Sequence, residues 1–252
     1  MANSASWEKI FKDNKILEHD FSKTPFYLSA KEIKKSVQNF ENTAEKEVRI
    51  LCKMDTRKSL PEIMRKNGLI LLPVKNGYYV IVKGEGYLDI PEIEGEADIY
   101  NTKLDFDLDT SKIGDSEMQH LDFAYASSLI RTFMDDPSLV LTIRGRKYTP
   151  QFSYKIGKHL IEIQGVQTEV DAGYEGKNKV VLIEAKNSST KDTIIRQLYY
   201  PYRQWSEHTN KKVFLLFFEK RIDEYLIWEY IFEDKNDYNS IKLIKSKKYK
   251  II

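Results

Sequence analysis

The chain has 252 residues, with 40 Lys and Arg against 38 Asp and Glu, so its formal net charge is +2. A chain of this length buries roughly 75% of its unfolded surface and needs no disulfide to form a core. Its apolar share of 41% and charged share of 31% are those of a soluble globular protein and exclude a disordered one. The single cysteine, Cys52, excludes an intramolecular disulfide framework and a cysteine-ligated zinc site.

The hydrophobic segments are short. The longest apolar runs, Leu69–Val74 and Val213–Phe218, fall well below the ~18–20 residues that span a bilayer. The first residues show neither the basic start nor the apolar stretch of a signal peptide. We therefore expect a cytoplasmic protein with no membrane partner.

Charge is unevenly distributed along the chain. Ten basic and six acidic residues lie between Lys31 and Lys66, whereas residues 84–122 contain twelve acidic and two basic ones. Residues 141–160 contain five basic residues and no acidic one, and five lysines lie within residues 242–250. Whether a basic surface exists depends on this distribution and not on the sum. Nucleic acid therefore stays a candidate partner, although a solvated surface explains any one of these segments equally well.

Helix starts in the first half follow from capping boxes, in which a serine caps the backbone and a Glu three residues later returns the bond. Ser29 with Glu32 and Ser59 with Glu62 fit this pattern. Asn67-Gly68 is a common helix end. The pattern predicts two helices before residue 68.

A β-hairpin is predicted after these helices, because apolar strands at 69–73 and 78–83 flank the turn-forming pair Asn76-Gly77. Two helices followed by a hairpin outline a winged-helix module, whose second helix can enter a DNA groove. Helix–hairpin units also occur in ordinary cores, so both interpretations stay open. We assign residues 1–97 to an N-terminal, winged-helix-like, DNA-contacting region, with the acidic stretch 84–115 as its linker.

The second half of the chain begins with a helix predicted from about Ser116, capped toward Gln119, to Met134. Strand patterns follow at 139–143, 151–156, 160–171 and 180–186. A helix from about 190, interrupted at Pro201, precedes strands at 212–218, 224–232 and 240–244. The order α-β-β-β-α-β plus extra strands indicates an α/β or α+β fold, with a mixed central β-sheet flanked by helices. We assign this domain to residues 98–252.

Acidic residues cluster on two consecutive predicted strands. Residues two apart in a strand point to the same side, so Glu169 and Asp171 share one face, and Glu184 and Lys186 share one face of the next strand. The intervening residues 172–179 form a plausible hairpin. Antiparallel pairing is then expected to bring Asp171 close to Glu184, with Lys186 at their edge.

Two carboxylates held close together repel each other unless a cation bridges them. Mg²⁺ suits such a pair, because it binds through one or two carboxylates and keeps positions for water and phosphate oxygens. A metal polarises the phosphoryl group and activates water, while a neighbouring lysine stabilises charge. These are the parts needed to hydrolyse a phosphodiester, although an exposed strand decorated with Glu and Lys is the alternative.

Asp171 with Glu184-Ala-Lys186 resembles the D…(D/E)-x-K motif of the PD-(D/E)xK nuclease superfamily, and the element order resembles the core of that superfamily. Longer stretches are similar to bacterial type II restriction endonucleases, namely 114–125, 142–147, 166–174 and 196–202. The resemblance covers most of residues 45–248. It departs from the motif at Val170, which stands where the motif has proline.

The resemblance implies a Mg²⁺-dependent bacterial enzyme that cuts double-stranded DNA at a short specific site, usually as a homodimer. It assigns Asp171 and Glu184 to the metal and Lys186 to catalysis, with in-line attack of water on phosphorus and release of the 3′ oxygen. The chain has no G-x-x-x-x-G-K-[ST] loop, so no nucleotide cofactor is expected.

Three further residues are candidates for supporting roles. Glu117 lies in the first turn of a predicted helix that supplies a metal-binding carboxylate in some members of the superfamily, although a helix N-terminus favours an acid anyway. Glu169 is either a second acid near the metal or a solvent-facing residue. In related nucleases a glutamine at the position of Gln197 can lie near the active site.

Basic residues in two segments are candidates for DNA contact, because arginine binds phosphate or guanine through two bonds and lysine contacts phosphate as a point charge. The candidates are Arg144, Arg146, Lys147, Lys58, Arg65 and Lys66. A solvated turn and a solvated helix surface are the alternatives. Two rival functions also stay open: a repair or structure-specific nuclease with the same core, and a non-catalytic winged-helix DNA-binding protein.

Overall fold

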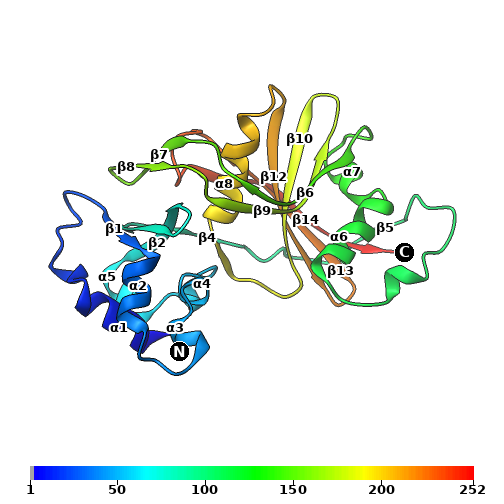
Figure 1. The fold of residues 1–252 in the computed structure, drawn as a ribbon. Coiled ribbons are helices and arrows are strands. Elements are labelled where there is room, and N and C mark those ends of the chain that lie inside the picture. The colour runs from blue at the N-terminus through cyan, green and yellow to red at the C-terminus, as the bar shows by residue number, and fades with distance from the viewer. Residues whose placement is uncertain (1–2) are drawn as a thin grey trace.

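A computed structural model of the chain describes residues 3–252 (Figure 1). Its N-terminal elements are α1 (Ser4–Asp13), the 3₁₀ turn η1 (Ile16–Glu18), β1 (Phe26–Ser29), α2 (Ala30–Val37), α3 (Thr43–Lys46), α4 (Val48–Leu51), the 3₁₀ turn η2 (Arg57–Ser59), α5 (Glu62–Asn67), β2 (Leu69–Lys75) and β3 (Tyr78–Lys83). The strands form a three-stranded antiparallel sheet in the order β1-β3-β2.

The helices of this region bury apolar residues spaced one turn apart. In α2, Ile33 and Val37 are four residues apart and fully buried, and Trp7 of α1 is also fully buried. The order helix, strand, four helices, hairpin contains the predicted helices and hairpin, and adds elements, β1 among them, that the sequence patterns did not predict. The β2–β3 turn falls at Asn76-Gly77, as predicted.

The capping predictions had mixed outcomes. Ser29 and Glu32 form a complete capping box at the start of α2, which confirms that prediction. The box proposed between Ser59 and Glu62 is wrong. Ser59 ends η2, whose cap is Thr56, and the residue before α5 is Pro61, which makes no side-chain cap.

The remaining elements build the larger part of the molecule. They are β4 (Tyr87–Asp89), β5 (Asp98–Tyr100), the 3₁₀ turn η3 (Thr110–Lys112), α6 (Glu117–Ala126), α7 (Leu129–Phe133), β6 (Val140–Tyr148), β7 (Phe152–Ile156), β8 (His159–Ile163), β9 (Gln167–Glu175), β10 (Lys179–Lys186), β11 (Asp192–Ile194), α8 (Arg196–Ser206), β12 (Lys212–Arg221), β13 (Glu224–Phe232) and β14 (Ile241–Ile251). A seven-stranded sheet has the order β5-β14-β13-β12-β10-β9-β6, and β7 with β8 forms a separate hairpin.

The large sheet is mixed and flanked by helices, which confirms the predicted fold class. The strand β10 pairs antiparallel with β9 and parallel with β12, so the connection through β11 and α8 crosses one face of the sheet. Val181 and Ile183 pack in the core cluster that contains α6 and α7, whereas Val180 and Leu182 pack in the cluster that contains α8. Both faces of β10 are therefore covered, as expected for a strand with a parallel neighbour.

Several elements differ from their predicted extents. The strand expected over 160–171 is two strands, β8 and β9, which belong to different sheets and are separated by Gly165 in a left-handed backbone with φ 64°. The strand expected over 240–244 extends to Ile251. The helix expected over 116–134 is split into α6 and α7, because Ser128 adopts a left-handed backbone with φ 65°. The helix expected from 190 begins at Arg196, since residues 192–194 form β11 and pair with β4. The expected linker 84–115 thus contains β4, and it also contains β5, which pairs with β14.

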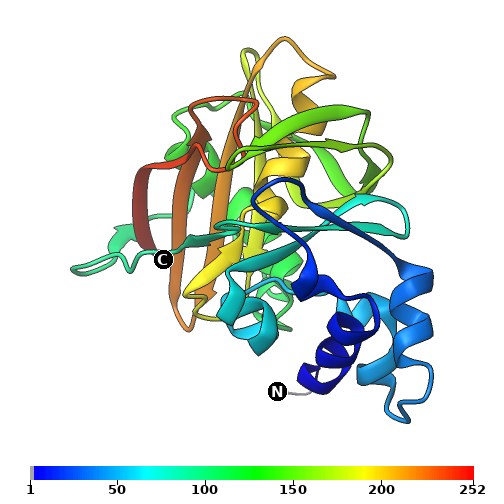
Figure 2. The same ribbon diagram turned by 90° about the vertical axis from the view of Figure 1, so that its left-hand side faces the viewer.

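The N-terminal region packs on the sheet face that carries α8, and Figure 2 shows its helices gathered at one end of the molecule. One cluster of buried residues extends from Trp7 in α1 through Leu182 in β10 to Trp228 in β13. The domain boundary predicted after residue 97 stays a prediction. The strand β4 lies before this boundary, but its pairing partner β11 lies after it. None of the helices in residues 3–252 combines the length and apolar composition that crossing a bilayer requires.

Candidate active site

Asp171, Glu184 and Lys186 meet where β9 and β10 part. The antiparallel register pairs Ile183 with Ala172, so Asp171 lies beside the end of β10. Its Oδ2 accepts a hydrogen bond of 2.8 Å from the backbone N–H of Ala185. Lys186 Nζ donates to Glu184 Oε1 and, at 3.0 Å, to the carbonyl of Ala185. The predicted proximity of the three side chains is confirmed.

Burial dominates the electrostatics of this cluster. Glu184 is 8% exposed, and burial, reinforced by the charge of Asp171, raises its pKa to about 7 even though Lys186 opposes the shift. Burial also raises the pKa of Asp171, against the Ala185 N–H and the charge of Lys186. For Lys186, burial lowers the pKa, but Glu184 and Asp171 outweigh it, so the net pKa is raised and the ammonium stays protonated.

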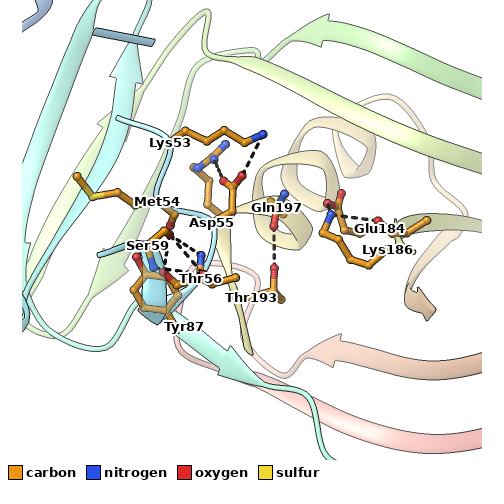
Figure 3. Close-up of polar contacts among 12 residues, drawn as sticks. Lys53, Met54, Asp55, Thr56, Ser59, Tyr87, Glu184, Lys186, Thr193 and Gln197 are labelled. Carbon is orange, nitrogen blue, oxygen red and sulfur yellow. Dashed lines mark hydrogen bonds and ion pairs between the residues drawn. The ribbon is translucent and has the colours of Figure 1, made fainter. Parts of the chain in front are cut away.

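The cluster lines a cleft of about 870 Å³ between the N-terminal region and the large sheet. One wall comes from α4, the segment after it and the β2–β3 turn, and the other from β9, β10 and the start of α8. Figure 3 shows Lys186 turned toward Glu184, with Gln197 between this pair and Asp55 of the N-terminal wall. The cleft is therefore shared by both parts of the chain.

The three predicted supporting residues all line this cleft. Glu117 opens α6, and its charge helps to raise the pKa of Lys186. Glu169 is exposed and pairs with Arg146 at 3.3 Å. The carbonyl Oε1 of Gln197 accepts a 2.7 Å hydrogen bond from Thr193 Oγ1, which holds the side chain at the start of α8.

The predicted DNA-contacting residues lie in different places. Arg144 is partly buried and paired with Asp122, and its charge lowers the pKa of Asp171. Arg146 is exposed and pairs with Glu169, which lines the cleft. Lys147 is exposed near the end of β6. The exposed residues of the second predicted set, Lys58, Arg65 and Lys66, lie outside the cleft lining.

Several charged residues of the cleft were missed by the sequence patterns. The N-terminal wall carries Arg49, Lys53, Asp55 and Lys75, and the opposite wall carries Arg196. Asp55 pairs with Arg196 at 3.5 Å, and its charge contributes to the raised pKa of Glu184. Only Lys75 had a local signal, since it precedes the turn at Asn76-Gly77. The others come together through tertiary packing.

The donor set fits a hard divalent cation. The protein contacts described above use Oδ2 of Asp171 and Oε1 of Glu184, whereas Oδ1 and Oε2 accept no hydrogen bond from residues 3–252. Within residues 3–252, no group of three or more His, Cys, Asp and Glu side chains is arranged to hold a metal ion. Two carboxylates complemented by water and phosphate oxygens are the donor set that Mg²⁺ prefers. Ligation by Glu117 or Glu169 stays a prediction.

Residues 82–250 match a family described as Domain of unknown function (DUF6997). The chain belongs to this family. Residues 4–81 match a second family, Domain of unknown function (DUF6996), and no curated protein and no solved structure matches the chain. Asp171, Glu184 and Lys186 all lie in the DUF6997 segment. The basic residues of the N-terminal wall, Arg49, Lys53 and Lys75, lie in the DUF6996 segment, so both segments build the cleft.

Proposed function

We propose that the protein is a type II restriction endonuclease, an enzyme that hydrolyses phosphodiester bonds in double-stranded DNA with Mg²⁺. The observation that carries the proposal is one cluster in a cleft of about 870 Å³: half-buried Asp171, buried Glu184, and Lys186, which donates to Glu184. Titratable residues perturbed by burial and by each other, and placed in a cleft, favour a catalytic role over surface decoration.

The residues divide the chemistry between them. Asp171 and Glu184 would hold the metal through the oxygens that the protein leaves free. Bound Mg²⁺ supplies a Lewis acid that polarises the phosphoryl group and lowers the pKa of water. Lys186 keeps its proton, because two carboxylates surround it, and presents a positive charge next to them. That charge stabilises the negative charge that develops on a phosphate in the transition state.

The remaining parts of the proposal follow the same resemblance to restriction endonucleases. The enzyme acts in the bacterial cytoplasm as a homodimer, and Arg144, Arg146 and Lys147 contact DNA next to the site. The N-terminal region, with its helices followed by a hairpin, contributes a winged-helix-like DNA-contacting surface. Neither a nucleotide cofactor nor a membrane takes part.

The test is cleavage of a mixed-sequence plasmid with Mg²⁺ by the wild type and by Asp171→Ala and Lys186→Ala. Loss of either charge is expected to lower the cleavage rate by at least about 100-fold, as for removal of one transition-state contact. Glu162→Gln, an exposed acid on β8, is the matched control and should cut normally. Circular dichroism checks that each variant is folded.

Each outcome separates the rival functions. Discrete fragments from the wild type alone support a restriction endonuclease. Nicking confined to branched or damaged DNA would indicate a structure-specific nuclease instead. A third outcome is sequence-specific binding that Asp171→Ala leaves intact, with no cleavage under any metal. It would show that the enzyme proposal is wrong and would favour a non-catalytic DNA-binding protein.

A further inference from the structure

The cleft wall that faces the carboxylates is basic and comes from the N-terminal region. It carries Arg49 of α4, Lys53 of the segment that follows, and Lys75 at the end of β2, and all three side chains are exposed. Within the part of the chain that the structure describes, neither Arg49 nor Lys75 forms a salt bridge, whereas Lys53 approaches Asp55 at 3.8 Å. Three cations therefore face the two proposed metal ligands across one cleft.

The acids on the same wall do not cancel this charge. Asp55 is drawn toward Arg196 of the opposite wall, at 3.5 Å, so a cation from outside the wall already balances it. Glu47 also lines the cleft and is exposed. The wall thus keeps a positive excess. The facing side is negative, because its four acids, Glu117, Glu169, Asp171 and Glu184, outnumber its two cations, Lys186 and Arg196. A phosphate chain repelled by those carboxylates is attracted by the wall.

The wall is fixed in position relative to the carboxylates. The carbonyl of Asp55 accepts a 2.9 Å hydrogen bond from the N–H of Ile194, and the carboxylate of Asp192 accepts one of 2.6 Å from the N–H of Arg57. These bonds fasten the segment that carries Lys53 to β11, a few residues after Lys186. The β2–β3 turn is held as well, because the N–H of Ala30 donates to the carbonyl of Gly77 at 2.8 Å.

We propose that Arg49, Lys53 and Lys75 bind the phosphates of the DNA strand that is cut, on either side of the scissile bond. Arginine binds a phosphate through two parallel bonds and lysine through a point charge, so this set suits a sugar–phosphate backbone. The strand lies between the basic wall and the carboxylates. The inference rests on the proposed function for the identity of the substrate, and it places α4 and the β2–β3 turn at the DNA, where the sequence had favoured α5.

The test measures binding of duplex DNA by fluorescence anisotropy without divalent metal, over a range of salt concentrations. The variant replaces Arg49, Lys53 and Lys75 with alanine together. Each lost phosphate contact lowers the slope of log affinity against log salt by about 0.9, so the slope is expected to fall by roughly two to three. The matched control replaces Lys158, Lys177 and Lys212 with alanine. These exposed lysines lie outside the cleft lining, so the control removes the same charge and should leave the slope near that of the wild type.

The outcomes decide whether the basic wall binds DNA phosphates. A reduced slope for the cleft variant alone supports the inference. An unchanged slope for the cleft variant, or an equal loss in the control, overturns it, and so does binding restricted to single-stranded DNA. If the wild type cuts DNA while the cleft variant binds normally, the inference fails and the proposed function stands. If nothing cuts but the cleft variant still loses slope, the proposed function fails and the phosphate-binding wall stands.

Discussion

Glu184 is held where its neutral form is favoured, because burial and the charge of Asp171 act against ionisation. Its pKa is about 7 in the folded chain and near 4.5 when unfolded, so between these values the folded state binds the extra proton. The stabilisation is complete below the unfolded pKa and is lost as pH rises through about 7. The shift corresponds to roughly 3 kcal/mol, and we expect the metal-free protein to lose stability from pH 5 to pH 8.

The measurement is urea unfolding of the metal-free wild type and of Glu184→Gln at pH 5 and pH 8. The amide cannot ionise, so the variant should lose less stability than the wild type over this range. Added Mg²⁺ should restore the wild type at pH 8 and have no such effect on the variant. Equal pH dependence of the two proteins would contradict the assigned environment of Glu184.

The part of the candidate site that could be predicted from the sequence consists of residues close together along the chain. Asp171 and Glu184 lie on strands joined by a short hairpin, so spacing of two along each strand and antiparallel pairing were sufficient to bring them together. Asp55 and Arg196 are far apart in the sequence, and neither lies in a periodic pattern that points to the other. Their pairing depends on how the N-terminal region packs against α8, which local patterns do not encode.

Among the elements, α8 is tied to its neighbours by a buried arginine. Arg203 is 4% exposed, and its Nη1 donates to the carbonyls of Ser153 at 3.0 Å and Lys235 at 3.1 Å. Its guanidinium also lies 4.4 Å from the centre of the Phe152 ring. The side chain therefore joins α8 to β7 and to the loop after β13.

Arg203→Met keeps much of the side-chain volume but leaves both carbonyls without their charged donor. Hydrogen bonds to charged groups contribute about 1.5–3 kcal/mol, so we expect the free energy of unfolding to fall by roughly 3 kcal/mol. Urea denaturation measures this loss. Lys158→Ala, at an exposed turn, is the control and should change stability by less than about 0.5 kcal/mol. If both substitutions had a similar effect, Arg203 would not stabilise the packing of α8 against β7 and the loop after β13.

Element types were more predictable than element ends. The hairpin at Asn76-Gly77 and the strand β10 follow from turn chemistry and apolar runs. The break between α6 and α7 occurs at Ser128, where a non-glycine residue adopts φ 65° with no proline or glycine to signal it. The strand β11 has three residues and exists because β4 pairs with it, so its sequence alone reads as the start of the helix that follows.

Over the whole molecule, the small net charge conceals an ordered division of charge. Acids of the segment 84–122 pair with bases from other elements, as in Arg57 with Asp89, Arg144 with Asp122 and Arg221 with Glu92. Among the described residues, five of the twelve acids in this stretch form salt bridges: Glu85, Asp89, Glu92, Asp98 and Asp122. Of the cations on the cleft wall, Lys53 forms one salt bridge, to Asp55, and Arg49 and Lys75 form none within residues 3–252. A protein of net charge +2 therefore still presents a basic surface beside its carboxylates.

The two family segments share one core, so we expect them to unfold together. The hydroxyl of Tyr87 donates to the carbonyl of Met54 at 3.0 Å, and the hydroxyl of Tyr200 donates to that of Pro73 at 3.0 Å. The N–H of Gln164 donates to the carbonyl of Val74 at 3.0 Å. Opening one segment alone would expose buried apolar surface and leave these polar groups without their hydrogen-bond partners, so separate unfolding is costly.

Hydrogen exchange measured by mass spectrometry across a urea series tests this coupling, because it reports each segment separately. Peptides from α1 and α2 should lose protection at the same urea concentration as peptides from β12 and β13. Exposed turns such as that around Lys158 exchange by local opening and serve as the internal reference. If the N-terminal helices open well before the sheet, the chain consists of two independently stable domains, and the wall of the cleft is not rigidly set against the carboxylates.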